Sequence, residues 1–204
     1  MSQPLSQEEI LKSQILQTAQ DLYQRYGIKK VTMDDVAKAV GKTRSALYYY
    51  FKNRDELFEA VMISLVDEVK DELEKMIYKE ETLESRIRAF CFAKVKGFKK
   101  TRNFITAIEA RMDSEERSKY SDIIWEIHQR MMRSETALLK KVIRDAVTAG
   151  EINEPDSTAL DVLLFVLLSS IRGIRRESVS ENYKDQWEDG AEMFAQMIVE
   201  KIKA

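Results

Sequence analysis

Apolar residues recur every three or four positions along most of this chain, which is the spacing that places them on one face of an α-helix. No stretch alternates apolar and polar residues over the length of a strand. With only six glycines and two prolines in 204 residues, few positions interrupt a helix. We therefore predict an all-α fold of about nine helices. The predicted helices are one between Ser6 and Gly27, Met33 to Val40, Arg44 to Phe51, Arg54 to Tyr78, Thr82 to Lys99, Arg102 to Met112, Ser114 to Ala149 with a bend or break near Arg133, Asp156 to Glu177, and Lys184 to Lys203.

The densest set of helix signals lies between residues 31 and 57. Thr32 is a good N-cap, and Asp35 three positions later gives a near-miss capping box, with Asp in place of Glu or Gln. Gly41 then supplies the left-handed residue that ends a helix, and Thr43 caps the next one. Two short helices joined by a tight glycine-containing turn are typical of a helix-turn-helix, whose second helix enters the major groove of DNA.

The second helix of this pair is rich in side chains that bind nucleic acid. Cations and hydroxyls can contact phosphates or base edges, and phenols can bond to phosphate oxygens. An aromatic run is more often core than contact, but successive helical residues are ~100° apart, so three tyrosines in a row cannot all be buried on one face. The predicted DNA-binding residues are Thr32, Lys42, Thr43, Arg44, Ser45, Tyr48, Tyr49, Tyr50, Lys52 and Arg54.

The same residues carry a family resemblance over about positions 8 to 62. The order Thr32, Val36-Ala37, Gly41, Leu47-Tyr48-x-Tyr50-Phe51-Lys52 and Asp55-Glu56-Leu57 resembles the DNA-binding domain of the TetR family of bacterial transcriptional regulators. Lys42 stands where that family commonly has a small apolar residue, and Ser45 where it often has glycine. Both departures concern the operator sequence and not the fold.

The distribution of charge agrees with a DNA-binding end. Residues 1–54 contain nine lysines and arginines against five acids, a charge of +4, which leaves −6 for the remainder of a chain whose total is −2. A basic head on an acidic body orients the molecule in the field of DNA and keeps the body away from it.

Two helices near the C-terminus carry more apolar surface than one chain can cover. The segment from Asp156 to Ile174 is apolar on nearly every face, and such a helix must be covered all round. The last helix offers a second apolar stripe, and the pair resembles the TetR dimer interface, a bundle of two helices from each subunit; a purely internal core is the alternative. The predicted interface residues are Leu164, Leu168, Ile171, Trp187, Phe194 and Ile198.

Between the head and these helices lies a cluster rich in aromatic and methionine side chains. Such linings suit a pocket for an apolar or amphipathic small molecule, although an ordinary core has the same composition. The predicted ligand-binding residues are Phe90, Phe104, Ile108, Met112, Trp125 and His128.

An enzyme is not predicted. One histidine and one cysteine cannot form the usual His/Cys metal cluster, and no GxSxG, HExxH or glycine-rich phosphate loop occurs, so we expect no metal and no cofactor. A dyad of Cys91 and His128 would require the fold to bring them together. The single cysteine, the polar start Met1 to Pro4 and the short apolar run Val162 to Leu168 lead us to expect a cytoplasmic protein outside the membrane.

These patterns together predict a DNA-binding regulator of transcription. Residues 1–53 form its helix-turn-helix domain, and residues 54–204 form an effector-binding and dimerisation domain. The resemblance implies a homodimeric repressor that binds a palindromic double-stranded operator and is released by a small molecule. The alternative is a TetR-like architectural or cell-division protein that binds DNA without an effector.

Overall fold

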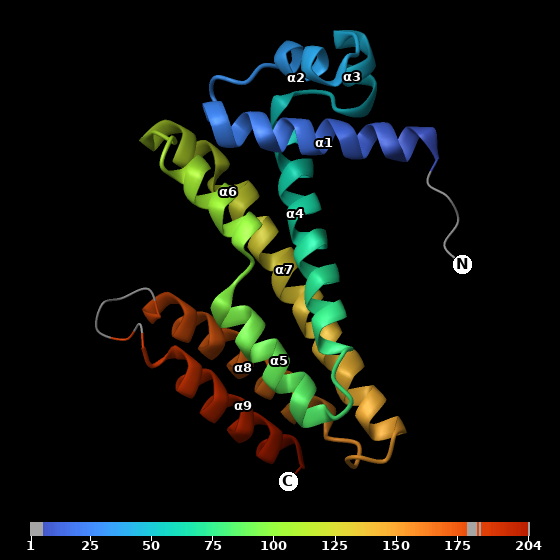
Figure 1. The fold of residues 1–204 in the computed structure, drawn as a ribbon, viewed down its shortest axis with the longest axis vertical. Helices are drawn as coiled ribbons and strands as arrows, with labels where there is room; N and C mark the ends of the chain where they lie inside the picture. Colours follow the sequence, from blue (N-terminus) through green and yellow to red (C-terminus); the bar gives the residue numbers. More distant parts are fainter. Residues whose placement is uncertain (1–5, 179–182, 184, 204) are drawn as a thin grey trace. The chain divides into compact units, whose positions relative to one another are not determined.

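The computed structural model describes residues 6–178, 183 and 185–203, and within these residues it contains nine helices and no strand. The prediction of an all-α fold is confirmed. The helices are α1 (Gln7–Tyr26), α2 (Met33–Val40), α3 (Arg44–Tyr50), α4 (Arg54–Ile77), α5 (Leu83–Lys96), α6 (Lys99–Glu109), α7 (Ser114–Thr148), α8 (Ser157–Glu177) and α9 (Trp187–Lys203) (Figure 1).

Most predicted helix ends agree with the structure to within one to three residues. The clearest difference is in α7, which runs without interruption through the predicted bend at Arg133. Lys184, the predicted first residue of the last helix, and the polar start at residues 1–4 lie outside the described residues.

The chain divides into two compact units that interleave in sequence. The first comprises Met1–Asp67 and Lys99–His128, and the second comprises Glu68–Phe98 and Gln129–Ala204. The predicted domain boundary between residues 53 and 54 falls inside the first unit. Helices α4 and α7 each begin in the first unit and end in the second.

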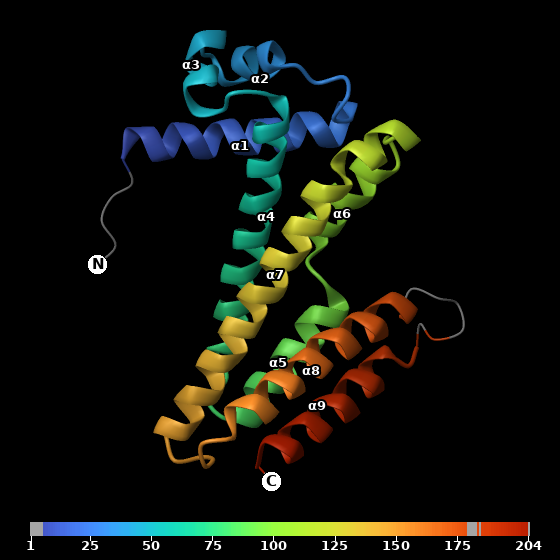
Figure 2. The ribbon, with the colours of Figure 1, turned by 180° about the vertical axis from the view of Figure 1, so that it is seen from behind.

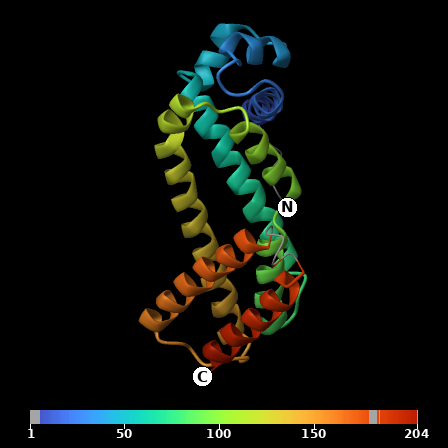
Figure 3. The same ribbon diagram turned by 90° about the vertical axis from the view of Figure 1, so that its left-hand side faces the viewer.

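In the first unit, α1 packs on α2 and α6, and α2 packs on α3 (Figure 3). Three buried rings hold its centre, with centroids 5.9 Å apart for Tyr23 and Phe58 and 4.8 Å apart for Phe58 and Tyr120. Tyr23 occupies the buried face of α1, whereas Tyr26 near its end is exposed. This first unit therefore joins the helix-turn-helix to α6 and the start of α7 through one shared core.

In the second unit, α5 packs against both α8 and α9, and α8 packs against α9 (Figure 2). Leu164, Leu168, Ile171 and Ile198 are buried in the core that these helices enclose. The polar contacts of this unit include a 2.5 Å hydrogen bond from the Tyr78 hydroxyl to Asp145.

The outward side of α8 and α9 is also apolar. Its exposed large side chains are Val162, Phe165, Val166, Met193 and Met197. By length and composition α8 could cross a membrane, yet the core helix of a soluble protein passes the same test, so one such helix carries little weight. Only 22% of its most apolar stretch is buried in the single chain, and a large part of α8 therefore remains to be covered.

Candidate nucleic-acid interface

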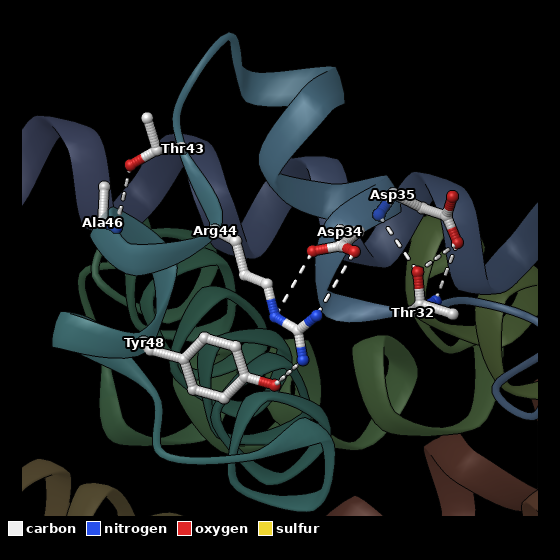
Figure 4. Close-up of polar contacts among 7 residues, drawn as sticks. All are labelled: Thr32, Asp34, Asp35, Thr43, Arg44, Ala46 and Tyr48. Atoms are coloured by element: carbon white, nitrogen blue, oxygen red, sulfur yellow. Dashed lines mark hydrogen bonds and ion pairs between the residues drawn. The ribbon is translucent and has the colours of Figure 1, made fainter.

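Helix α2 begins at a complete capping box. Thr32 accepts a hydrogen bond from the Asp35 amide at 3.2 Å, and the Asp35 carboxylate accepts from the Thr32 amide at 2.9 Å and from its hydroxyl at 2.7 Å (Figure 4). These hydrogen bonds hold the pKa of Asp35 below its usual range. Because the Thr32 hydroxyl is engaged in this way, its first role is to start the helix.

The turn between α2 and α3 depends on Gly41, whose φ of +70° and ψ of +32° lie in the left-handed region. The Lys42 amide reaches back to the Ala37 carbonyl at 2.9 Å, which satisfies a carbonyl at the end of α2. Thr43 then caps α3 by accepting from the Ala46 amide at 3.2 Å. The sequence signals for both ends of this turn are confirmed.

Helix α3 buries one edge and exposes the rest. Leu47 and Phe51 are 0% and 3% exposed, which fixes the inward face of the helix. Of the three consecutive tyrosines, Tyr49 is 76% exposed, Tyr48 is 38% exposed and Tyr50 is half-buried. Of the ten predicted DNA-binding residues, all but Tyr50 and Arg54 are exposed.

Arg44 lies at the centre of the exposed polar contacts (Figure 4). Its Nε lies 3.5 Å from Asp34 Oδ1, its Nη2 donates to the Tyr48 hydroxyl at 3.3 Å, and its guanidinium lies 5.3 Å from the centroid of the Tyr48 ring. The hydrogen bond to Tyr48 and the charge of Asp34 raise the pKa of Arg44. A guanidinium is in any case positively charged at every physiological pH. Asp34 is a residue that sequence reasoning missed, because no local signal links positions ten apart.

Lys52 and Arg54 flank the start of α4 and differ in their surroundings. The Lys52 side chain is exposed, and its amide donates to the Glu56 carboxylate at 2.7 Å. Arg54 is half-buried, and its Nη1 donates to the Lys29 carbonyl at 3.1 Å. Arg54 therefore holds the loop between α1 and α2, and Lys52 is the freer cation for a phosphate.

The helix-turn-helix is braced by ion pairs within the first unit. Lys29 Nζ lies 2.8 Å from Asp113 Oδ2, before α7, and Lys119 Nζ on α7 lies 2.8 Å from Asp55 Oδ1 on α4. The Tyr120 hydroxyl donates to the same Asp55 oxygen at 3.1 Å. Lys29 is thus committed to an acid of its own chain.

The predicted ligand-binding residues are divided between the two units. Phe104, Ile108 and Met112 are buried in the first unit, and Phe90 is buried in the core of the second. Trp125 is 62% exposed, and its ring centroid lies 6.0 Å from that of His128 on the next turn of α7.

Two further observations concern the enzyme alternative. Burial raises the pKa of the Cys91 thiol to about 12, so that it remains protonated and is a poor nucleophile at neutral pH. Among the residues that the structure describes, no group of three or more His, Cys, Asp and Glu side chains is placed to hold a metal ion.

The helix-turn-helix, together with α1, which packs on α2, indicates the class of protein to which the N-terminal end belongs. Residues 15–61 match the family model for bacterial regulatory proteins of the tetR family, which confirms the resemblance found in the sequence. The N-terminal end of this chain is therefore a TetR-family DNA-binding domain.

Similarity to individual regulators extends beyond this domain. The chain is 28% identical over 160 residues to an uncharacterized HTH-type transcriptional regulator of Bacillus subtilis, YhgD, covering 77% of this chain and 81% of that protein. It is 32% identical over 52 residues to a probable acrEF/envCD operon repressor of Escherichia coli K12, covering 26% of this chain and 24% of that protein. These relatives are named as regulators and not as enzymes.

The fold is shared with solved structures over almost the whole chain. A TetR transcription regulator from Haloarcula marismortui superimposes with a TM-score of 0.64 at 17% identity, covering 96% of this chain and 99% of that one. At this identity the likeness concerns the fold alone.

Proposed function

We propose that this protein is a homodimeric transcriptional repressor that binds a palindromic DNA operator and is released from it by an apolar or amphipathic small molecule. The observation that carries the proposal is the exposed face of a TetR-family helix-turn-helix, on which Arg44, Tyr48 and Tyr49 project from α3 and Lys52 from the connection that follows it. In this proposal residues 1–53 read DNA and residues 54–204 bind the effector and the second subunit.

The DNA-contacting residues take distinct roles. Arg44, at the start of α3, contacts base edges, because a guanidinium forms bidentate bonds with the acceptors of guanine. Lys42, Ser45, Tyr48, Tyr49 and Lys52 contact the phosphate backbone. Thr32 and Thr43 act through the helix ends that they cap, and Tyr50 and Arg54 support the surface from partly buried positions.

The second subunit covers the outward face of α8 and α9. The exposed set Val162, Phe165, Val166, Met193 and Met197 is apolar and lies on two helices that pack against each other. Exposed apolar surface of this kind marks a site of protein association. Leu164, Leu168, Ile171 and Ile198 have almost no exposed surface to give to a partner, so this proposal replaces them with the outward set and retains only the half-buried Trp187 and Phe194.

The effector acts by its differential affinity for two arrangements of the dimer. Two heads occupy both half-sites only when their separation matches the DNA, so a ligand that prefers another arrangement weakens operator binding by the ratio of its two affinities. A coupling of ~1 to 3 kcal/mol produces a roughly 5- to 150-fold loss of affinity. Of the six positions predicted from the sequence, this proposal retains Phe90 as the effector contact, because it lies in the core of the second unit.

Operator binding tests the proposal directly. The sites are located by selecting genomic fragments on the purified protein, and affinities are measured by fluorescence anisotropy over a range of salt. Arg44→Ala should weaken specific binding more than non-specific binding. Lys52→Ala should weaken both about equally and reduce the magnitude of the salt slope by roughly one unit. Lys201→Ala, which removes an exposed cation from α9, is the control of equal charge. Unchanged binding in both head variants would refute the groove assignment.

A further inference from the structure

A cavity of about 340 Å³ lies in the first unit, between the end of α1 and the end of α6. These two helices pack against each other, and Arg111, two residues after α6, donates from its Nε to the Gln24 carbonyl at 3.5 Å. Gly27 ends α1 at this place, and a Cβ there would lie only 3.3 Å from Arg111 Cβ. The bare backbone of Gly27 therefore makes room for the Arg111 side chain along the wall of the cavity.

The two acids that line this cavity are engaged with the protein itself. The carboxylate of Glu116, a residue that is 8% exposed, accepts from the Asp113 amide at 3.3 Å, and Asp113 Oδ1 accepts from the Glu116 amide at 2.9 Å. Asp113 Oδ2 lies 2.8 Å from Lys29 Nζ. Both carboxylates therefore bind backbone amides at the start of α7, and one of them also pairs with Lys29.

The cations of the cavity outnumber these acids, and they are Arg25, Lys29, Lys30 and Arg111. Arg25, Lys30 and Arg111 form no ion pair with any residue that the structure describes. Like charges around one cavity repel one another, and their combined field concentrates anions there. The cavity therefore has an excess of two positive charges and three cations with unused hydrogen-bond donors.

The position and size of the cavity restrict what it can hold. None of the residues that line it belongs to α2 or α3, so it lies outside the helix-turn-helix pair. It is also separate from Phe90, the proposed effector contact, which belongs to the second unit. Its volume is at the lower end of the range of ~300 to 1,000 Å³ that is typical of pockets for small ligands. The occupant is therefore a small anion or one anionic group of a larger molecule.

We propose that this cavity binds a phosphate group through Arg25, Lys30 and Arg111. A guanidinium forms two parallel hydrogen bonds with a pair of phosphate oxygens, and a lysine ammonium adds a point charge. The bound phosphate offsets the excess positive charge and links the end of α1 to the segment between α6 and α7. It belongs either to a free phosphorylated small molecule or to the backbone of DNA. This inference does not depend on the proposed release of DNA by an effector.

The test uses pyrophosphate as the probe. It is titrated into the full-length protein without DNA by isothermal calorimetry, with the ionic strength held constant by sodium chloride. We expect saturable binding, and Arg111→Met and Lys30→Met should each weaken it roughly tenfold, because each removes a charge-assisted donor. Arg111→Lys should retain part of the affinity. Arg102→Met is the matched control, since Arg102 is an exposed arginine of α6 that does not line the cavity.

The source of the phosphate is distinguished by the salt dependence of binding to non-specific double-stranded DNA. If the cavity holds a backbone phosphate, Arg111→Met should reduce the magnitude of the salt slope by roughly one unit, whereas an unchanged slope assigns the cavity to a free small molecule. Circular dichroism confirms that each variant is folded. The absence of saturable pyrophosphate binding, or equal affinity in the parent, Arg111→Met and Lys30→Met, would overturn the inference.

Discussion

Arg44 and Asp34 form an ion pair on the exposed side of the helix-turn-helix, with 3.5 Å between Arg44 Nε and Asp34 Oδ1. The side chains are 63% and 45% exposed, so the pair contributes little to stability in water. The ion pair instead affects the binding of DNA. A carboxylate beside the proposed base-reading guanidinium repels the phosphates of any DNA and restrains the orientation of Arg44.

Asp34→Asn should therefore tighten binding to non-specific DNA by several-fold at low salt and lower the ratio of specific to non-specific affinity. The reason is that one negative charge leaves the binding face while the restraint on Arg44 is lost. Anisotropy titrations with operator and scrambled duplexes measure both affinities. Asp21→Asn on α1, where the exposed Asp21 accepts from Gln17, controls for the change in net charge. An unchanged specificity ratio would show that Asp34 does not orient Arg44.

Thr32→Ala should lower the free energy of unfolding by about 1 kcal/mol, because it removes the side-chain half of the capping box. Thr32→Ser should restore most of that loss, since serine supplies the same acceptor. Urea denaturation measures the change, and operator binding at a temperature where both variants are fully folded separates stability from recognition. A stable Thr32→Ala protein that fails to bind DNA would instead make Thr32 a direct contact.

The pair of Asp55 and Lys119 predicts a dependence on pH. Burial alone would raise the pKa of Asp55, but hydrogen bonds from Lys119 and Tyr120 outweigh it, so this pKa is below its usual range. A carboxyl group whose folded pKa is depressed contributes stability above its unfolded pKa of about 3.9, and that contribution is lost as pH falls through the folded value. Asp55→Asn should thus be less stable than the parent at pH 6, and the difference should shrink as the pH falls below about 4. Thermal unfolding followed by circular dichroism across this range tests the difference, and a constant gap would contradict it.

The dimer surface is tested by two adjacent residues of α8. Phe165 is 64% exposed and Leu164 is fully buried. Phe165→Glu should give a folded monomer by analytical ultracentrifugation, because the charge disrupts only the proposed contact between subunits. Leu164→Glu should unfold the chain, because it buries an unpaired charge in the core. A Phe165→Glu protein that remains dimeric would place the interface elsewhere. If the variant is monomeric but newly binds lipid vesicles, that binding would show how strongly α8 favours an apolar environment.

The sequence predicts this fold well where the signals are local. Thr32, Gly41 and Thr43 define the ends of α2 and α3 within a few residues of one another, and the structure confirms each. The faces of the apolar helices are harder to predict. Along α8 nearly every face is apolar, so periodicity does not distinguish the buried Leu164 from the exposed Phe165. Which of these two residues is buried depends on the packing of α8 against α5 and α9, and local periodicity contains no information about that packing.

Ion pairs between residues far apart in sequence are a second structural feature that local sequence patterns do not reveal. Lys94 and Glu135 are separated by 41 residues, and each resembles an ordinary surface residue of an amphipathic helix. Their pairing depends on how α5 and the second half of α7 pack within one unit. The hydrogen-bonded contacts of Arg44 with Asp34 and of Asp55 with Lys119 arise in the same way.

Lys94 and Glu135 are each 4% exposed, and Lys94 Nζ lies 2.5 Å from Glu135 Oε1. This buried ion pair is the basis of a last prediction, which concerns stability. Removing one partner leaves an uncompensated charge in the core, so Lys94→Met should lower the free energy of unfolding by roughly 3 to 5 kcal/mol. Replacing both residues, with Lys94→Met and Glu135→Leu together, removes both charges at similar volume and should recover most of that loss. Urea denaturation of the parent, the two single variants and the double variant completes the cycle. Additive losses in the double variant would show that the two groups are not energetically coupled.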